Sequence, residues 1–148
     1  MSAAEGGFRW PALAPYFLGA LRLVAAFMFI LSGTMKLFGI PIGMPPNGGT
    51  AVAFSEIWFA GVLEVFGGGL IFLGLFTRPV AFILSGEMAV AYFQFCQPVS
   101  IWPIANMGVA PALYCFVWLY FSAAGPGAWS LDRARERAKV RKLGTSFG

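Results

Sequence analysis

Hydrophobic and polar residues are segregated along this chain into long apolar segments and short polar stretches. An apolar helix of about 20 residues crosses the hydrocarbon core of a bilayer, because each residue adds about 1.5 Å. Proline and glycine gather between the apolar segments, where they would interrupt a helix. The pattern predicts an all-α integral membrane protein, a four-transmembrane-helix bundle, with spans at about residues 17–38, 56–76, 79–97 and 107–124.

The composition agrees with this class. Of 148 residues, 59% are hydrophobic and 11% are charged, and the mean hydropathy is +0.77. A soluble domain has about 25% charged residues, so a soluble fold of this chain would need a largely apolar exterior. We expect a single membrane domain over residues 1–148.

The C-terminal segment differs from the four spans. Residues 132–142 hold six Lys or Arg and two acids, and they follow Ser130, a residue type favoured as a helix N-cap. We expect residues 130–148 to form a basic cytoplasmic tail, with a short amphipathic helix on the anionic surface of the lipid bilayer. The alternative is a frayed, solvated tail, because so short a helix is marginal in water.

The basic residues predict an orientation. With four spans, Arg9, Arg22, Arg78 and the tail lie on one side of the membrane, and Lys36 lies on the other. Basic residues favour the cytoplasmic side. We therefore expect both termini in the cytoplasm.

Four charged residues lie within the spans or at their edges: Arg22, Lys36, Glu64 and Glu87. A charge in hydrocarbon costs several kcal/mol unless it is paired, protonated or hydrated. From the helical rise we expect Arg22 to pair with Glu87, and Lys36 to reach Glu64. Gln94 shares the face of Glu87, so these five residues would form a buried polar core.

The helix faces that carry these charges contain many small residues. Arg22 and Lys36 share a face with Ala25, Ala26, Phe29 and Gly33. Glu64 shares its face with Ile57, Ala60, Gly61, Gly67, Gly68 and Ile71. Small residues favour close contact between helices in a membrane.

The buried charges have two interpretations. They can fix the register of the helices, because ionised side chains are excluded from lipid. They can also line a polar cavity that binds a small polar or quinone-like head group, or that carries protons. The residues alone leave both interpretations open.

Other residue types limit the chemistry. The chain has no His, so its own side chains cannot supply an imidazole ligand to haem or zinc. Cys96 and Cys115 should be free thiols, because their expected heights differ by about 10 Å, more than a disulfide allows. We find no zinc, phosphate-loop or dinucleotide motif, and we expect no metal, no covalently bound cofactor and no nucleic-acid partner.

Four stretches occur in a fixed order: Ser32-Gly33-Thr-Met-Lys36-Leu, Glu64-Val-Phe-Gly67-Gly68, Glu87-Met-Ala-Val-Ala-Tyr-Phe93 and Ala124-Gly-Pro-Gly-Ala-Trp-Ser-Leu-Asp132. Together they resemble the DoxX family of small bacterial membrane proteins, over about residues 21–132. The resemblance implies four helices in the bacterial inner (cytoplasmic) membrane. The small and polar positions that match the family's pattern are Gly33, Lys36, Glu64, Gly67, Gly68, Arg78, Glu87 and Asn106.

The resemblance also implies an association with redox chemistry. The family takes its name from a subunit linked to a terminal quinol oxidase, and a related protein forms part of a thiosulfate:quinone oxidoreductase. This association would bring a quinone as ligand and other membrane subunits of a redox complex as partners.

The chain departs from its resemblance at two outer positions. Many close relatives carry His shortly before the proline that ends the third span, where this chain has Phe95-Cys96-Gln97-Pro98. They often read Asn-Gly-Gly-Glu where it has Asn106-Met-Gly-Val109. The outer face would then serve as an apolar contact surface for another subunit, formed by Trp102, Met107 and Val109.

Three functions fit these patterns. The first is a non-catalytic accessory membrane subunit of a quinone-linked redox complex, which would make the chain no enzyme on its own. The second is a membrane oxidoreductase that binds a quinone-like substrate in the bundle, with Glu64 and Glu87 as proton carriers. The third is a small transporter or lipid-binding protein, although we see no inverted repeat. A homo-oligomer is an alternative assembly.

Overall fold

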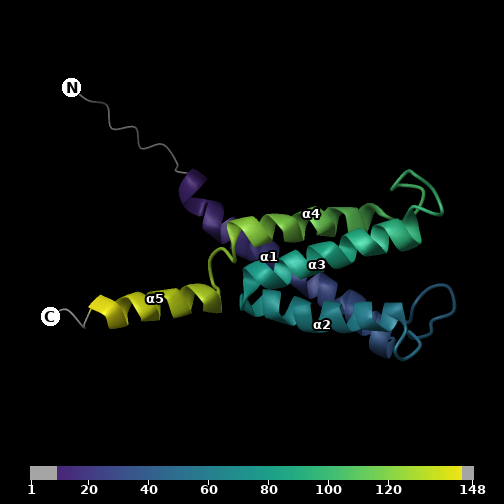
Figure 1. Ribbon diagram of the computed structural model, residues 1–148, viewed down its shortest axis with the longest axis horizontal. Coiled ribbons are helices and arrows are strands. Elements are labelled where there is room, and N and C mark those ends of the chain that lie inside the picture. Colours follow the sequence, from purple (N-terminus) through teal and green to yellow (C-terminus); the bar gives the residue numbers. More distant parts are fainter. Residues whose placement is uncertain (1–9, 145–148) are drawn as a thin grey trace, which may run out of the picture.

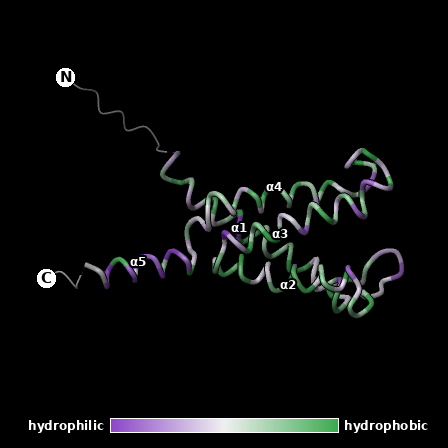
Figure 2. The backbone as a smooth tube through the Cα atoms, in the orientation of Figure 1, coloured by the Kyte–Doolittle hydropathy of each residue, from purple (hydrophilic) through white to green (hydrophobic). Residues whose placement is uncertain are grey.

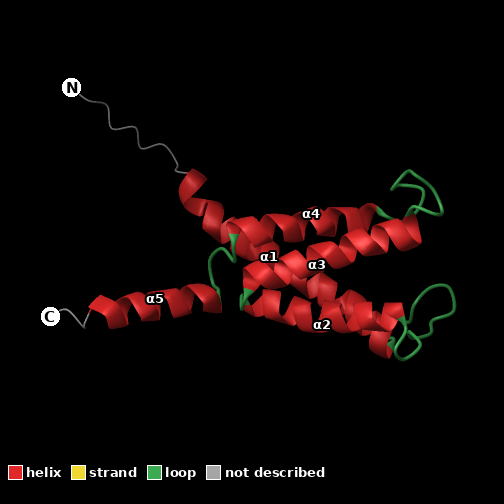
Figure 3. Ribbon diagram, in the orientation of Figure 1, coloured by secondary structure: helices red, strands yellow, loops and turns green. Residues whose placement is uncertain are grey.

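The structure, a computed structural model, describes residues 10–144 and is built from helices (Figure 1). Figure 3 shows the same arrangement by secondary structure, with no strand among the described residues. Arg9 and residues 145–148 of the expected tail lie outside the described residues. The helices are α1 (Trp10–Phe38), α2 (Glu56–Leu73), α3 (Thr77–Ala91), the short π-helical segment η1 (Tyr92–Cys96), α4 (Val109–Ala124) and α5 (Leu131–Gly144).

The first four α-helices form a bundle of two packed pairs. α1 packs against α2 and α3 packs against α4, with fewer contacts between α2 and α3. Figure 1 shows the first turns of α1, the turn between α2 and α3, and the start of α5 at one end, which we call the α5 end. The two long loops, residues 39–55 and 97–108, lie at the opposite end, which we call the loop end.

Three helical stretches are long and apolar enough to cross a membrane: α1, α2 and the continuous stretch Thr77–Cys96. The fourth expected span corresponds to α4, a shorter apolar helix of 16 residues. Figure 2 contrasts the hydrophobic colour of much of the bundle with the hydrophilic colour of α5. The length and composition of these helices are those of a membrane protein.

Differences from the expected boundaries have local causes. α1 already includes Trp10, the first described residue, and so it extends before the expected residue 17. Gly74 ends α2 in the left-handed conformation, with φ 67°. Met107 also has a positive φ of 59°, so α4 begins two residues later, at Val109.

The buried core lies between all four bundle helices. Trp118 of α4 is fully buried, and its ring lies 5.2 Å from that of Phe29 in α1, edge to face. Ile71 of α2 and Leu84 of α3 belong to the same cluster. Many other large apolar residues of these helices face outward, where lipid tails can replace protein as their surroundings.

α5 continues away from the bundle along the long axis of the molecule (Figure 1). Its apolar residues are not gathered on one face. Leu131 and Val140 are both exposed, and they are two and a half helical turns apart, so they point in opposite directions. The described part of the tail is helical, but the expectation of an amphipathic helix is wrong, because the apolar residues of α5 share no face. That this helix lies on the surface of the bilayer stays a prediction.

Candidate functional site

Glu64 of α2 is buried and paired with Lys36 of α1. Nζ of Lys36 lies 2.5 Å from Oε1 of Glu64, and the Ser32 hydroxyl donates a longer hydrogen bond of 3.3 Å to the same oxygen. The Glu64 side chain is 2% exposed. The two helices run antiparallel, and helical side chains lean toward the N-terminus of their own helix, so these two lean toward one another. The expected Lys36–Glu64 pair is confirmed.

Contact between two glycines brings the helices close enough for this pair. A Cβ atom added to Gly33 of α1 would lie 2.8 Å from the carbonyl oxygen of Gly61 and 2.9 Å from Cβ of Glu64. A Cβ atom added to Gly61 would lie 3.1 Å from Cβ of Lys36. Gly33 has no room for a side chain, and at Gly61 a side chain would require its neighbours to shift, so α1 and α2 approach closely beside the ion pair.

The small-residue face of α2 contacts both of its neighbours. A Cβ atom on Gly67 would lie 2.7 Å from the side chain of Leu84 in α3, and one on Gly68 would lie 2.9 Å from that of Ile30 in α1. The expected close packing is confirmed for the buried residues of this face, which are Gly61, Glu64, Gly67, Gly68 and Ile71. It is wrong for the first turns of α2, where Ile57 is exposed and Ala60 is half-buried beside the groove.

Glu87 of α3 lies near the ion pair without joining it. Neither of its carboxylate oxygens has a hydrogen-bond partner among the described residues, although both are buried, and the same is true of Oε2 of Glu64. Glu87 interacts electrostatically with Glu64 and with Lys36. The cluster therefore combines two carboxyl groups with one ammonium group. One additional proton makes it neutral, and neutrality is strongly favoured away from water.

Glu87 also forms part of a groove between α2 and α3. The groove has a volume of about 500 Å³. Gln94, expected in the buried core, is exposed and lines this groove, because the wider turns of η1 rotate it away from the α-helical register. Its apolar lining residues are Phe59, Ala60, Leu63, Ile83, Val90, Ala91 and Phe95, and its polar ones are Glu56, Glu87 and Gln94.

Arg22 of α1 binds the loop at the α5 end. Its guanidinium donates hydrogen bonds of 2.7 Å to the carbonyl oxygen of Pro126 and 2.8 Å to that of Trp129, and the residue is fully buried. The expected Arg22–Glu87 pair is therefore wrong. Arg22 leans toward the N-terminus of α1, which lies at the α5 end, and so its head group leaves the level of Glu87.

Asp132 attaches α5 to the start of α3. Its carboxylate accepts hydrogen bonds from the backbone N–H groups of Phe76, at 3.0 Å, and Thr77, at 2.9 Å, and from the Thr77 hydroxyl, at 3.0 Å. Partial burial opposes ionisation of Asp132. The hydrogen bonds from Thr77 and Phe76, with the charge of Arg135, outweigh it and lower the pKa of Asp132 below its ordinary value.

The residue types at the starts of α3 and α5 indicate this attachment. Phe76, at the N-cap of α3, has no side-chain acceptor, so the first N–H groups of that helix need a partner from elsewhere. Ser130 already accepts a hydrogen bond from the backbone N–H of Arg133 and so caps α5 itself. Asp132, two residues later, was therefore free to cap another helix.

Two further family-pattern residues bind backbone carbonyl groups. Arg78 donates a hydrogen bond of 2.7 Å to the carbonyl oxygen of Ala123, at the end of α4. Asn106 is buried at the loop end, where its amide donates to the carbonyl oxygen of Ser100, at 2.7 Å, and its oxygen accepts from the N–H of Gly108, at 2.8 Å. Both residues hold connections between helices and lie apart from the Lys36–Glu64–Glu87 cluster.

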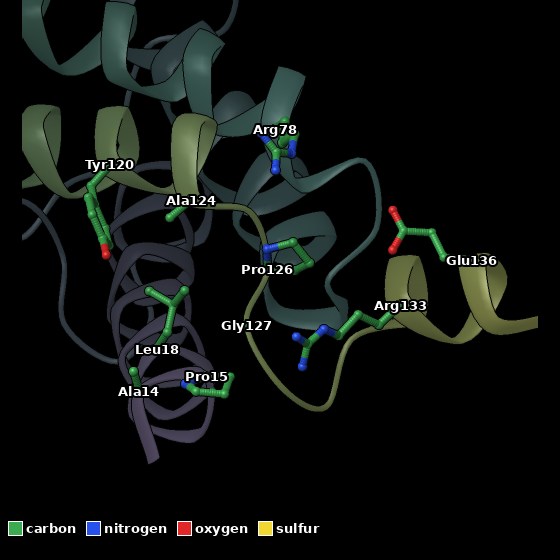
Figure 4. Close-up of a pocket in the computed structure, with 10 residues that line it drawn as sticks. All are labelled: Ala14, Pro15, Leu18, Arg78, Tyr120, Ala124, Pro126, Gly127, Arg133 and Glu136. Carbon is green, nitrogen blue, oxygen red and sulfur yellow. The ribbon is translucent and has the colours of Figure 1, made fainter. Parts of the chain in front are cut away.

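A hollow of about 400 Å³ lies beside Arg78 at the α5 end (Figure 4). Figure 4 shows Arg78 and Pro126 on one side, Tyr120 and Leu18 on another, and Arg133 and Glu136 projecting from α5. Its charges are mixed in sign. It is separate from the groove that contains Glu87.

Exposed apolar residues cover the loop end. Trp102 is 70% exposed, Met107 85% and Val109 42%. Cys96 and Cys115 are free thiols, as expected. Among the described residues, no group of three or more Cys, Asp or Glu could hold a metal ion.

Comparison with known proteins identifies the relatives of this chain. The DoxX family model matches residues 17–97, from α1 to η1. The chain belongs to the DoxX family. An uncharacterized protein of Haemophilus influenzae is 49% identical over 122 residues, which cover 80% of this chain and 90% of that protein. An uncharacterized membrane protein of Mycobacterium tuberculosis is 27% identical over 157 residues, which cover 94% of this chain and 93% of that protein. No solved structure has significant similarity to this chain.

The part of the chain that matches the DoxX model contains the whole charged cluster. Lys36, Glu64 and Glu87 all lie within residues 17–97, whereas Asp132 lies beyond them. The cluster and the groove are thus built from the segment shared with the family.

Proposed function

We propose that this protein is a membrane subunit of a quinone-linked redox complex and that it binds a quinone head group in the groove between α2 and α3. The observation that carries the proposal is the pair of buried Glu87 oxygens without a hydrogen-bond partner among residues 10–144, in a residue that lines an apolar groove. A buried carboxyl group without a partner is costly and marks a functional site in a membrane protein.

The groove suits a lipophilic ligand with a small polar head. Its apolar walls can hold a ring and the first part of an isoprenoid tail, while Glu87 and Gln94 are lining residues whose side chains can form hydrogen bonds. Reduction of a quinone consumes two electrons and two protons. In this proposal a partner subunit supplies the electrons and one proton, and Glu87 delivers the other proton from its cluster with Lys36 and Glu64.

The proposal includes a topology. α4 serves as the fourth span, and the α5 end faces the cytoplasm of a bacterial inner membrane. The positions of the charges support this orientation. Arg22, Arg78 and the basic helix α5 lie at one end of the bundle, whereas Lys36 lies toward the other, and basic residues favour the cytoplasmic side.

Photolabelling tests the groove. The protein is reconstituted in nanodiscs and illuminated with an azido-quinone, and labelled peptides are mapped. We expect labels in α2 and α3 that excess unlabelled quinone prevents. Ala60→Phe, which fills the groove, should abolish them, and Ala20→Phe, on an exposed face of α1, should leave them unchanged. Labelling that persists in Ala60→Phe would overturn the groove as the binding site.

Infrared spectroscopy tests the proton role. Reduction of bound quinone should change a carboxyl band in the difference spectrum of the wild-type protein. Glu87→Gln should remove this change of the carboxyl band but should still be labelled by the azido-quinone. Glu56→Gln, at an exposed position of the same groove, should keep the change of the band. An unchanged band in Glu87→Gln would show that Glu87 does not carry the proton.

The exposed loop end favours a second candidate, an accessory subunit that docks to a partner without a binding site of its own. Trp102 and Met107 are 70% and 85% exposed, and Asn106 fixes the loop that bears them. Purification in a mild detergent should recover a membrane partner with the wild-type protein, and less of it with Trp102→Ser and Met107→Ser together. Co-purification without quinone labelling would favour this candidate over the first.

A further inference from the structure

We propose that a hollow between the start of α1 and the start of α5 binds the phosphate group of an anionic phospholipid. The hollow has a volume of about 420 Å³. It is distinct from the groove proposed for the quinone, because it lies at the opposite end of α3. The residues of its lining that matter for binding are Tyr16, Trp129, Ser130, Arg133 and Arg137.

The hollow has the charge that a phosphate requires. Arg133 and Arg137 are one helical turn apart, so both guanidinium groups project from the same side of α5. Neither has an ion pair or a side-chain hydrogen bond within residues 10–144, and the described lining contains no Asp or Glu. Arginine binds phosphate oxygens through paired N–H groups, so two free guanidinium groups suit one phosphate.

The hollow beside Arg78, described above, also includes Arg133 in its lining but differs in charge. It contains Arg78 and Glu136 together, and Arg78 already donates to the carbonyl oxygen of Ala123. Figure 4 shows the Arg133 guanidinium directed toward the loop at Gly127, with the Glu136 carboxylate away from it, so Arg133 lies between the two hollows. Of the two hollows, Arg137 lines only the one without an acid, and an anion there meets positive charge that no carboxylate of the lining compensates.

The depth of the hollow points to a lipid as the source of the phosphate. α1 has 29 residues and is about 43 Å long at 1.5 Å per residue, more than the roughly 30 Å of a hydrocarbon core. Its first turns therefore extend into the head-group layer. Tyr16 and Trp129 pack edge to face with ring centres 5.6 Å apart, and such aromatic residues favour this layer.

The surrounding backbone holds the hollow open in a fixed shape. The N–H of Ala128 donates a hydrogen bond of 2.7 Å to the carbonyl oxygen of Pro15, which joins the loop to α1. Arg22 binds the same loop from beneath through Pro126 and Trp129. The residues that line the hollow come from the first turns of α1, from the loop before α5 and from the start of α5; Figure 1 shows the two helices diverging from this junction.

Native mass spectrometry of the full chain tests the proposal, with nanodiscs that contain phosphatidylcholine and phosphatidylglycerol. We expect the wild-type protein to retain phosphatidylglycerol in preference to phosphatidylcholine. Arg133→Ala combined with Arg137→Ala should weaken this retention about 25-fold, at about fivefold for each basic residue near the membrane surface. Arg133→Lys with Arg137→Lys should restore part of it, because the charge remains.

A control with the same loss of charge separates a site from general attraction. Lys139→Ala with Lys142→Ala also removes two positive charges about one turn apart on α5, but these residues do not line the hollow. This control variant should still retain phosphatidylglycerol in preference to phosphatidylcholine. Equal loss in both double variants would overturn the proposal, since it would leave a diffuse basic surface as the sole attraction.

A soluble phosphate forms the last arm of the experiment. Inorganic phosphate is added to the protein in nanodiscs of phosphatidylcholine alone, and binding is read from the thermal midpoint. We expect no shift that depends on Arg133 and Arg137. A shift of the thermal midpoint that is lost in Arg133→Ala with Arg137→Ala, without retention of phosphatidylglycerol, would show that the hollow binds a soluble anion. That result would overturn the proposal that a lipid supplies the phosphate.

Discussion

The carboxylate of Asp132 accepts hydrogen bonds from both the backbone N–H and the hydroxyl group of Thr77, at 2.9 and 3.0 Å. The two residues belong to different helices, α5 and α3. A negative charge at the N-terminus of a helix interacts favourably with the helix dipole and satisfies N–H groups that have no partner within the helix. One side chain therefore serves as the cap of α3 and as the attachment of α5.

Removal of this cap should destabilise the α5 end. Asp132→Ala leaves the first N–H groups of α3 without their acceptor, and loss of an N-cap costs about 1–2 kcal/mol. We expect that decrease in the free energy of unfolding, measured by titration with denaturing detergent. Cleavage by protease after residue 124 should also become faster. Glu136→Ala removes an exposed acid from the same helix and should change neither measurement; equal effects of the two substitutions would contradict the capping role.

The same carboxylate predicts a dependence on pH. Because its pKa is lower in the folded protein than in the unfolded chain, the folded state binds fewer protons in this range. The stabilisation is complete above the unfolded pKa of about 4, and it is lost as the pH falls through the lower folded value. The difference in thermal midpoint between wild type and Asp132→Ala should therefore be constant near pH 7 and shrink below about pH 4. A difference that grows with acidity would refute this assignment.

The Lys36–Glu64 pair should show strong coupling. Removal of one partner from a buried pair costs about 3–5 kcal/mol, and we expect the lower end because Lys36 is 19% exposed. Lys36→Met should cost more than Glu64→Gln, because it leaves Glu64 and Glu87 together without a cation. The double variant should cost less than the sum of the two single ones. Additive free energies of unfolding in this cycle would exclude a direct interaction.

The glycine contact between α1 and α2 gives a prediction with a matched control. Gly33→Ala places a methyl group 2.8 Å from a carbonyl oxygen of the facing helix and should cost about 1–3 kcal/mol by overpacking. Gly69→Ala, farther along α2 and with open space around its Cβ, should be neutral or stabilising by up to about 1 kcal/mol, since Ala favours helix. Similar stability of the two variants would show that the helices separate without cost.

The sequence predicted those parts of the fold that depend on helix periodicity. Glu64 and its small neighbours share one face at helical spacing, and this face is buried as expected from Gly61 to Ile71. Lys36 and Glu64 could be paired because they lie at similar heights on antiparallel neighbours. Both the buried face and the ion pair follow from the positions of residues along their helices.

The parts that could not be predicted depend on the direction of a side chain or on a loop. Arg22 and Glu87 are also near in height, but Arg22 leans toward the α5 end and binds Pro126 and Trp129. Gln94 left the expected face because η1 changes the helical register. Arg22 binds two backbone carbonyl groups. Every residue has such a group, so the sequence does not indicate which ones bind an arginine.

The groove between α2 and α3 opens sideways, between two helices of membrane length, and several of its apolar lining residues are more than half exposed. A molecule that approaches Glu87 by this route must first dissolve in the bilayer. Its effective concentration at the groove is then set by its partition coefficient and by the amount of lipid, and only indirectly by its concentration in water. Apparent dissociation constants for this groove should therefore rise in proportion to the lipid added, and ligands of equal head-group chemistry should rank by the length of their tails.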